Sequence, residues 1–177
     1  MSPLLRRSPW FLFLATLLPA ILAAAAPSPF VGTWRYLPDG STQLSGWDAL
    51  DLVFAQQGAT LTLTRDFSAG RRKFEDVTPL DPEGTVANVR VDWWPDNRHI
   101  GAYIGPDHQK QVRARWIEPD RILRTTTDLV LETQQGLHPV NILTDYRLSP
   151  RGDRLTVIEL RSTRDRPTVY LFERVRP

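Results

Sequence analysis

Hydrophobic and polar residues alternate along most of the chain after residue 30. In the clearest segment, one face carries Val140, Ile142, Thr144, Tyr146 and Leu148, and the other carries Asn141, Asp145 and Arg147. This period of two predicts strands with one buried and one solvent-facing side. The same pattern recurs at residues 50–54, 61–64, 87–93, 99–104 and 111–116.

Short turn sequences separate these segments, and almost nothing after the N-terminal segment has the period of a helix. Examples are Pro38-Asp39-Gly40, Pro95-Asp96-Asn97 and Pro150-Arg151-Gly152-Asp153, all suited to tight reversals. Several links are short enough for hairpins, so we expect an antiparallel meander. About 8–10 such strands bury one face best by closing into a β-barrel, which also removes the open edges. A sandwich of two sheets is the alternative.

The first 25 residues have the layout of a secretion signal. Arg6 and Arg7 form a positive start, residues 10–22 are an apolar run, and Ala23-Ala24-Ala25 provides small residues for cleavage. The run is short for a membrane span and contains Pro19, so an uncleaved anchor is the weaker reading. We therefore expect export to the periplasm or the medium, with no stable membrane anchor after cleavage. Residues 26–177 then form a single domain.

Removing this signal changes the charge balance. The whole chain has 22 basic and 20 acidic residues, and only Arg6 and Arg7 fall within the signal. The remaining domain is therefore formally neutral, which gives no indication of a nucleic-acid partner. The chain contains no cysteine, so disulfides, thiolate metal sites and cysteine nucleophiles are excluded.

Both ends of the predicted domain carry the marks of a known barrel type. The first strand contains Gly32 and Trp34, and the last contains Arg174 after Tyr170 and Phe172. This arrangement resembles the lipocalin-type barrel, in which a first-strand tryptophan crosses the floor and a late arginine packs over it. The resemblance implies that Gly32, Trp34 and Arg174 are a structural signature, with a cation–π contact between Arg174 and Trp34.

The nearer resemblance is to small exported bacterial lipocalin-like proteins of unassigned function. They have a similar Phe-x-Gly-Thr-Trp start, here Phe30 to Trp34, and a mid-chain tryptophan followed by a leucine, here Trp116 and Leu123. They also contain a Leu-Ser-Pro-x-Gly-x-x-Leu-Thr hairpin, here Leu148 to Thr156, and end in an aromatic-x-Arg strand, here Phe172 to Arg174. The segment from Thr78 to Trp94 fits this pattern less well.

Aromatic residues on the apolar faces are the candidate ligand-binding residues. An antiparallel barrel of this size can enclose an apolar cavity, and aromatic walls with a few polar tips suit a hydrophobic ligand. We expect this lining to include Tyr36, Trp93, Trp116 and Tyr146. Arg113 and Arg115 alternate with the apolar face, so we expect them in solvent. With the opposite assignment of faces they would line the cavity and favour an anionic ligand.

Other chemistry finds little support. His99 and His108 lie near acidic residues, but a metal needs three or four converging ligands, and His138 is in a predicted loop. No serine-hydrolase elbow or glycine-rich phosphate loop occurs. We therefore expect no enzyme, cofactor or metal.

Two functional hypotheses follow from this reading. The first is an exported barrel that binds a small hydrophobic or amphipathic ligand. The second is a solid-cored barrel that acts as an extracytoplasmic protein-interaction module, which an exposed apolar patch around Trp47 or Trp94 would favour.

Overall fold

The structure, a computed structural model, describes residues 27–95 and 102–176. These residues form eleven strands and no helix: β1 Gly32–Leu37, β2 Ala49–Gln57, β3 Thr60–Ala69, β4 Arg72–Leu80, β5 Ala87–Arg90, β6 Tyr103–Ile104, β7 Gln109–Glu118, β8 Ile122–Thr133, β9 Gly136–Leu148, β10 Arg154–Arg161 and β11 Thr168–Arg174. The predicted signal at residues 1–25 and the candidate ligand His99 lie outside the described residues. Among those that are described, no helical segment has the length and apolar character of a membrane span.

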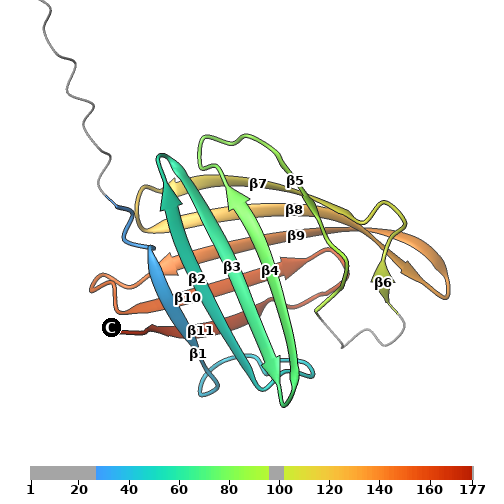
Figure 1. The fold of residues 1–177 in the computed structure, drawn as a ribbon, viewed down its shortest axis with the longest axis horizontal. Helices are drawn as coiled ribbons and strands as arrows, with labels where there is room; N and C mark the ends of the chain where they lie inside the picture. The colour runs from blue at the N-terminus through green and yellow to red at the C-terminus, as the bar shows by residue number, and fades with distance from the viewer. Residues whose placement is uncertain (1–26, 96–101, 177) are drawn as a thin grey trace, which may run out of the picture.

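All strands belong to one antiparallel sheet, ordered β4-β3-β2-β1-β11-β10-β9-β8-β7-β5, with the short β6 paired to β8 beside this path. The first and last strands are neighbours, with Trp34 opposite Arg174 and Tyr36 opposite Phe172. The sheet curls so that β2–β4 lie across β7–β10, and the ring is nearly closed (Figure 1). The prediction of an all-β antiparallel barrel is confirmed, with ten strands along the main path, and the two-sheet sandwich is not formed.

The strand predicted at residues 87–93 is shorter in the structure. β5 ends at Arg90, and residues 91–95 have no regular structure. In this segment the Pro95 carbonyl accepts a hydrogen bond of 2.7 Å from the Trp47 indole Nε1. The strand predicted at residues 99–104 lies in part outside the described residues, and its described part contains β6.

The ring is open between β4 at one edge and β5, paired to β7, at the other, a gap that we call the seam. Here the described residues form only one isolated backbone bridge, between Glu83 and Arg115. Side chains span the rest: the Lys110 ammonium on β7 donates to the Asp76 carboxylate on β4 at 2.6 Å and to the Thr78 hydroxyl at 2.7 Å. Closure of the barrel therefore depends in part on side chains rather than on a continuous backbone ladder.

The end of the barrel opposite Trp47 and Pro95, which we call the floor, is a packed apolar core built around Trp34. This side chain is fully buried, and its Nε1 donates a 2.8 Å hydrogen bond to the Phe30 carbonyl. The Arg174 guanidinium lies 4.1 Å from the Trp34 ring centroid, the contact expected from the sequence. Other almost fully buried side chains around it are Phe30, Phe54, Leu61, Leu123, Leu155 and Phe172.

Arg174 also explains the glycine at the start of β1. Its guanidinium donates hydrogen bonds to the carbonyls of Pro29, Val31 and Gly152. Gly32 has a φ of 130°, and a Cβ there would lie 2.9 Å from Arg174 Nη1. The backbone conformation and the close approach of the guanidinium both favour a residue without a side chain.

Candidate functional site

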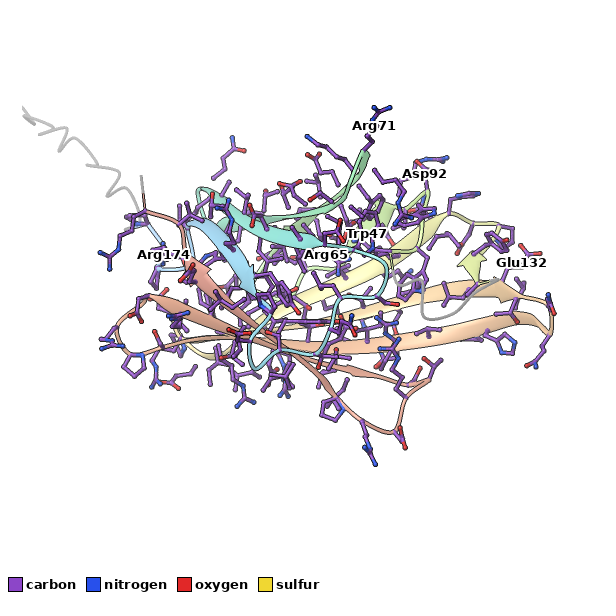
Figure 2. All side chains as sticks on the ribbon, turned by 90° about the horizontal axis from the view of Figure 1, so that it is seen from below. Trp47, Arg65, Arg71, Asp92, Glu132 and Arg174 are labelled. Carbon is purple, nitrogen blue, oxygen red and sulfur yellow. The ribbon has the colours of Figure 1, made fainter. Side chains whose placement is uncertain are left out.

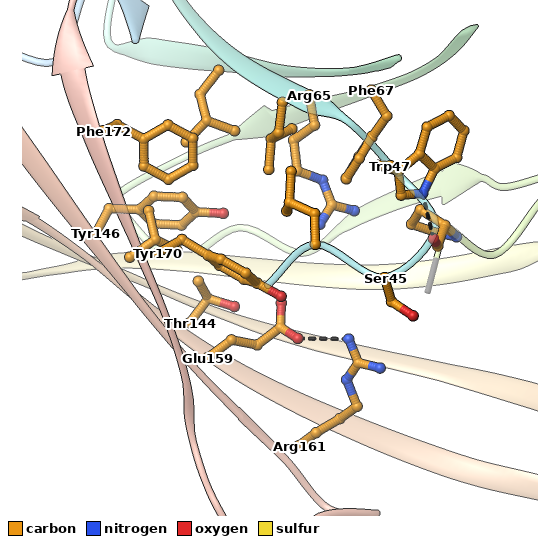
Figure 3. Close-up of a pocket in the computed structure, with 15 residues that line it drawn as sticks. Ser45, Trp47, Arg65, Phe67, Thr144, Tyr146, Glu159, Arg161, Tyr170 and Phe172 are labelled. Carbon is orange, nitrogen blue, oxygen red and sulfur yellow. Dashed lines mark hydrogen bonds and ion pairs between the residues drawn. The ribbon is translucent and has the colours of Figure 1, made fainter. Parts of the chain in front are cut away.

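The barrel interior contains two adjoining cavities, each of about 60 Å³. The first, which we call the apolar cavity, is lined largely by Leu50, Leu52, Phe67, Val157 and Phe172, with Trp47 at its rim (Figure 3). The second, which we call the polar cavity, reaches the seam and is lined by threonines and charged groups as well as apolar side chains. The residues that line both are Arg65, Pro95, Thr144, Tyr146, Glu159 and Arg161.

A buried ionic cluster of Arg65, Asp76 and Lys110 forms the wall of the polar cavity at the seam. Asp76 accepts hydrogen bonds from Arg65 Nε at 2.9 Å and from Lys110 Nζ at 2.6 Å. Asp76 and Lys110 are 7% and 6% exposed, so this pair is shielded from water. Figure 2 shows Arg65 and Trp47 between the layers of the barrel wall, whereas Arg71 and Glu132 project outward.

The pKa values in this cluster follow from burial and from the two cations around one carboxylate. Burial opposes ionisation of Asp76, but the charges of Arg65 and Lys110 outweigh it and lower the Asp76 pKa to about 2. Burial and the charge of Arg65 lower the pKa of Lys110 to about 8, although Asp76 acts in the opposite direction. Burial raises the pKa of the neighbouring Tyr146 to about 12, so its hydroxyl stays neutral.

The low pKa of Asp76 predicts a loss of stability in acid. The folded-state pKa lies below the unfolded value, so the stabilisation is present above about pH 4 and disappears as the pH falls towards 2. A shift of this size corresponds to about 2 kcal/mol. Urea unfolding of the wild type and of Asp76→Asn between pH 6 and pH 2 should show the stability difference narrowing by this amount. If the unfolding free energies of the two proteins differed by the same amount at every pH in that range, the lowered pKa of Asp76 would be contradicted.

A second ion pair lies where the two cavities meet. Arg161 donates to Glu159 at 2.6 Å, the contact drawn as a dashed line in Figure 3. The Arg161 guanidinium also lies 4.8 Å from the Trp94 ring centroid. Both residues come from the inner face of β10, as the continuation of the apolar positions Leu155 and Val157.

Aromatic side chains surround the end of the barrel that lies opposite the floor, which we call the mouth. Trp47 packs against Phe67 and Trp93, each with centroids 5.4 Å apart, and Phe74 lies 4.9 Å from Trp93. Because Trp47 also hydrogen-bonds Pro95, this cluster joins the loop before β2 to residues 91–95. Any occupant of the apolar cavity would therefore meet aromatic surface at the mouth.

Two of the four predicted ligand-binding residues line the cavities. Tyr146 lines both, and Trp93, which is 37% exposed, lines the polar cavity. Tyr36 and Trp116 are not among the described residues that line either. The Tyr36 hydroxyl donates to the Thr42 carbonyl at 2.9 Å, and the Trp116 ring packs against Phe30 in the floor.

Sequence reasoning missed the charged residues of the interior, although the alternation contained the signal. Arg65 lies between the inward residues Leu63 and Phe67, and Lys110 is two residues before the inward Val112. Continuing the period of two by one step would place both on the inner face. Arg113 and Arg115 are exposed, as expected, so the assignment of inner and outer faces is correct.

The two tryptophans named for a protein-interaction surface are buried. Trp47 is 7% exposed and Trp94 is 8% exposed. The patch that would have favoured the interaction module is therefore not present at these residues. As for metals, the described part of the chain contains no group of three or more histidine or acidic side chains placed to hold an ion.

Comparisons with known proteins add information on the fold alone. No family model and no curated protein matches the chain. Among solved structures, it is similar to secretory abundant heat soluble protein 4 from Ramazzottius varieornatus, with a TM-score of 0.53. That likeness covers 85% of this chain and 97% of the other at 9% identity. At so low an identity, it supports a shared barrel-like architecture and carries no function across.

Proposed function

We propose that this protein is exported and binds a short amphipathic molecule inside its barrel. The observation that carries the proposal is the pair of adjoining cavities, one mainly apolar and one that combines apolar side chains with polar and charged groups, which share six lining residues. A ligand that spans both would bury its tail against Leu52, Val157 and Phe172 and keep its polar end among the hydroxyl and charged groups. Burial of the tail would supply most of the affinity.

The cavity volumes set the size of this ligand. About 60 Å³ holds roughly four to six water-sized groups. The apolar cavity therefore suits a chain of a few carbons, not a long lipid, which would need the contact between Trp47 and Pro95 to open.

The N-terminal sequence supports the export part of the proposal. Arg6 and Arg7, the apolar run and the alanines at positions 23–26 have the order of a cleavable signal. The resemblance to small exported lipocalin-like proteins, carried by Gly32, Trp34 and Arg174, points in the same direction.

Calorimetric titration with 1-alkanols of increasing length tests the binding proposal. We expect the affinity of protein purified from the full-length chain to rise roughly fourfold per methylene, since each buried CH₂ contributes about 0.8 kcal/mol. The rise should stop when the apolar cavity is filled. Absence of binding at every length would remove the proposal.

A matched pair of substitutions on β10 locates the binding. Val157→Phe places a larger side chain in the apolar cavity and should reduce the affinity for the longer alkanols about tenfold or more. Ile158→Phe makes a similar change one residue later, on the opposite face of the strand, and should leave the affinity unchanged. Circular dichroism checks that both variants fold. Equal affinity of the two variants would place the ligand elsewhere.

A further inference from the structure

The polar cavity carries more positive than negative side chains. Its lining includes three cations, Arg65, Lys110 and Arg161, and two carboxylates, Asp76 and Glu159. Glu159 pairs with Arg161, which leaves Asp76 as the one carboxylate within hydrogen-bonding distance of both Arg65 and Lys110. Among the described lining residues, cations therefore outnumber carboxylates by one, inside a barrel where a charge is costly without a partner.

Lys110 retains capacity to bind a further acceptor. An ammonium group has three N–H donors, and two of them are directed to Asp76 and Thr78. The third has no partner among the described residues. Because its pKa is about 8, the side chain is mainly protonated at pH 7 and can donate this hydrogen bond with its full charge.

Trp94 supplies a second donor. Its side chain is 8% exposed and lines the polar cavity, and its Nε1 has no hydrogen-bond partner among the described residues. A buried N–H without an acceptor costs free energy that a ligand oxygen would restore.

We infer that the polar cavity binds a monocarboxylate group, with Lys110 and Trp94 as its donors and Arg65 as the neighbouring charge. A carboxylate accepts hydrogen bonds only, as these donors require, and its single negative charge balances the single excess positive charge. A doubly charged phosphate would leave the cavity with net negative charge. This inference rests on the proposed function, because the carboxylate is the polar end of the amphipathic ligand whose tail occupies the apolar cavity.

The experiment compares three probes of equal chain length: hexanoate, 1-hexanol and hexylamine. Isothermal titration at pH 7 should show hexanoate binding the wild type at least about tenfold more tightly than 1-hexanol, because a charge-assisted hydrogen bond adds to the same apolar burial. Lys110→Met should reduce this preference to less than about threefold. Lys73→Met is the matched control, since Lys73 is exposed on β4 and should leave the preference unchanged.

Trp94→Phe provides a second variant, with a smaller aromatic ring that lacks the indole N–H. It should reduce the preference for hexanoate several-fold, so the inference stays testable if Lys110→Met does not fold. Binding of none of the three probes overturns the proposed function itself. Equal binding of hexanoate and 1-hexanol overturns only the carboxylate site. Tighter binding of hexylamine would show that Asp76 or Glu159 recognises the ligand instead, and this too overturns the inference.

Discussion

Replacing Asp76 by asparagine should destabilise the fold by about 3–5 kcal/mol, because it leaves the buried Lys110 and the partly exposed Arg65 without their shared counter-charge. Asp76 is 7% exposed and accepts hydrogen bonds from both cations. It also carries the contact across the seam, where the described strands share one isolated backbone bridge. The loss would be a large part of the 5–15 kcal/mol that typically stabilises a domain.

Urea unfolding at pH 7 measures this effect, and Asp51→Asn is its matched control. Asp51 pairs with Arg35 on the outer surface at 3.0 Å, where the arginine side chain is 60% exposed. Exposed ion pairs of this kind contribute less than about 1 kcal/mol to stability, so Asp51→Asn should reduce the free energy of unfolding by no more than that. If both variants lose the same stability, the buried cluster does not hold the seam.

Lys110 distinguishes the roles of the two cations. Its lowered pKa shows that the charged form is disfavoured in the folded barrel, whereas the pKa of Arg65 is raised because the charge of Asp76 outweighs the effect of burial. Arg65 and Asp76 are therefore the stabilising pair, and Lys110 is held in the cluster at a cost. Lys110 still spans the seam to Asp76 and Thr78, and an ammonium whose burial is only partly compensated fits the role in ligand binding inferred above.

The alternation of apolar and polar residues predicted the strands of the barrel wall, because a period of two directly indicates which face of a sheet is buried. Val140, Ile142 and Tyr146 all face the interior, and Trp34 meets Arg174 as the motifs at the two ends of the chain indicated. These features depend on local pattern and on the pairing of the first and last strands. The contact between Trp34 and Arg174 joins the two ends of the chain, and it was predicted from the resemblance to lipocalin-type barrels rather than from the alternation.

The position of Lys110 in the ionic cluster could not be predicted in the same way, because β7 shares no continuous backbone ladder with β4, whereas Arg65 and Asp76 are direct partners in the β3–β4 ladder. Asp76 and Lys110 are 34 residues apart and meet only because the ring curls until its two edges face each other. Charged residues are seldom buried, so a pattern analysis assigns them to solvent by default. The partner of Tyr36 was not predicted for a related reason: its ring packs against the core, and its hydroxyl donates to the carbonyl of Thr42 in a loop.

Replacing Trp34 by alanine should destabilise the fold by about 3–5 kcal/mol, the usual cost of removing a fully buried aromatic side chain from a core. Trp34 is 0% exposed and fills the floor of the barrel between Phe30 and the Arg174 guanidinium. The truncation removes the hydrogen bond to the Phe30 carbonyl and leaves Arg174 without the ring on which it rests. Thermal or urea unfolding measures the loss.

Trp93→Ala makes the same truncation at the mouth, where the side chain is 37% exposed, and should cost about 1 kcal/mol. Trp34→Phe separates packing from hydrogen bonding in the floor, since it keeps an aromatic ring and removes the indole N–H. The free energy of unfolding of Trp34→Phe should lie between those of the wild type and Trp34→Ala, because an unpaired carbonyl of Phe30 costs about 1–3 kcal/mol. If Trp34→Ala were no more destabilising than Trp93→Ala, the floor would not be the principal core of the barrel, and the first and last strands would have to be held together by their backbone ladder alone.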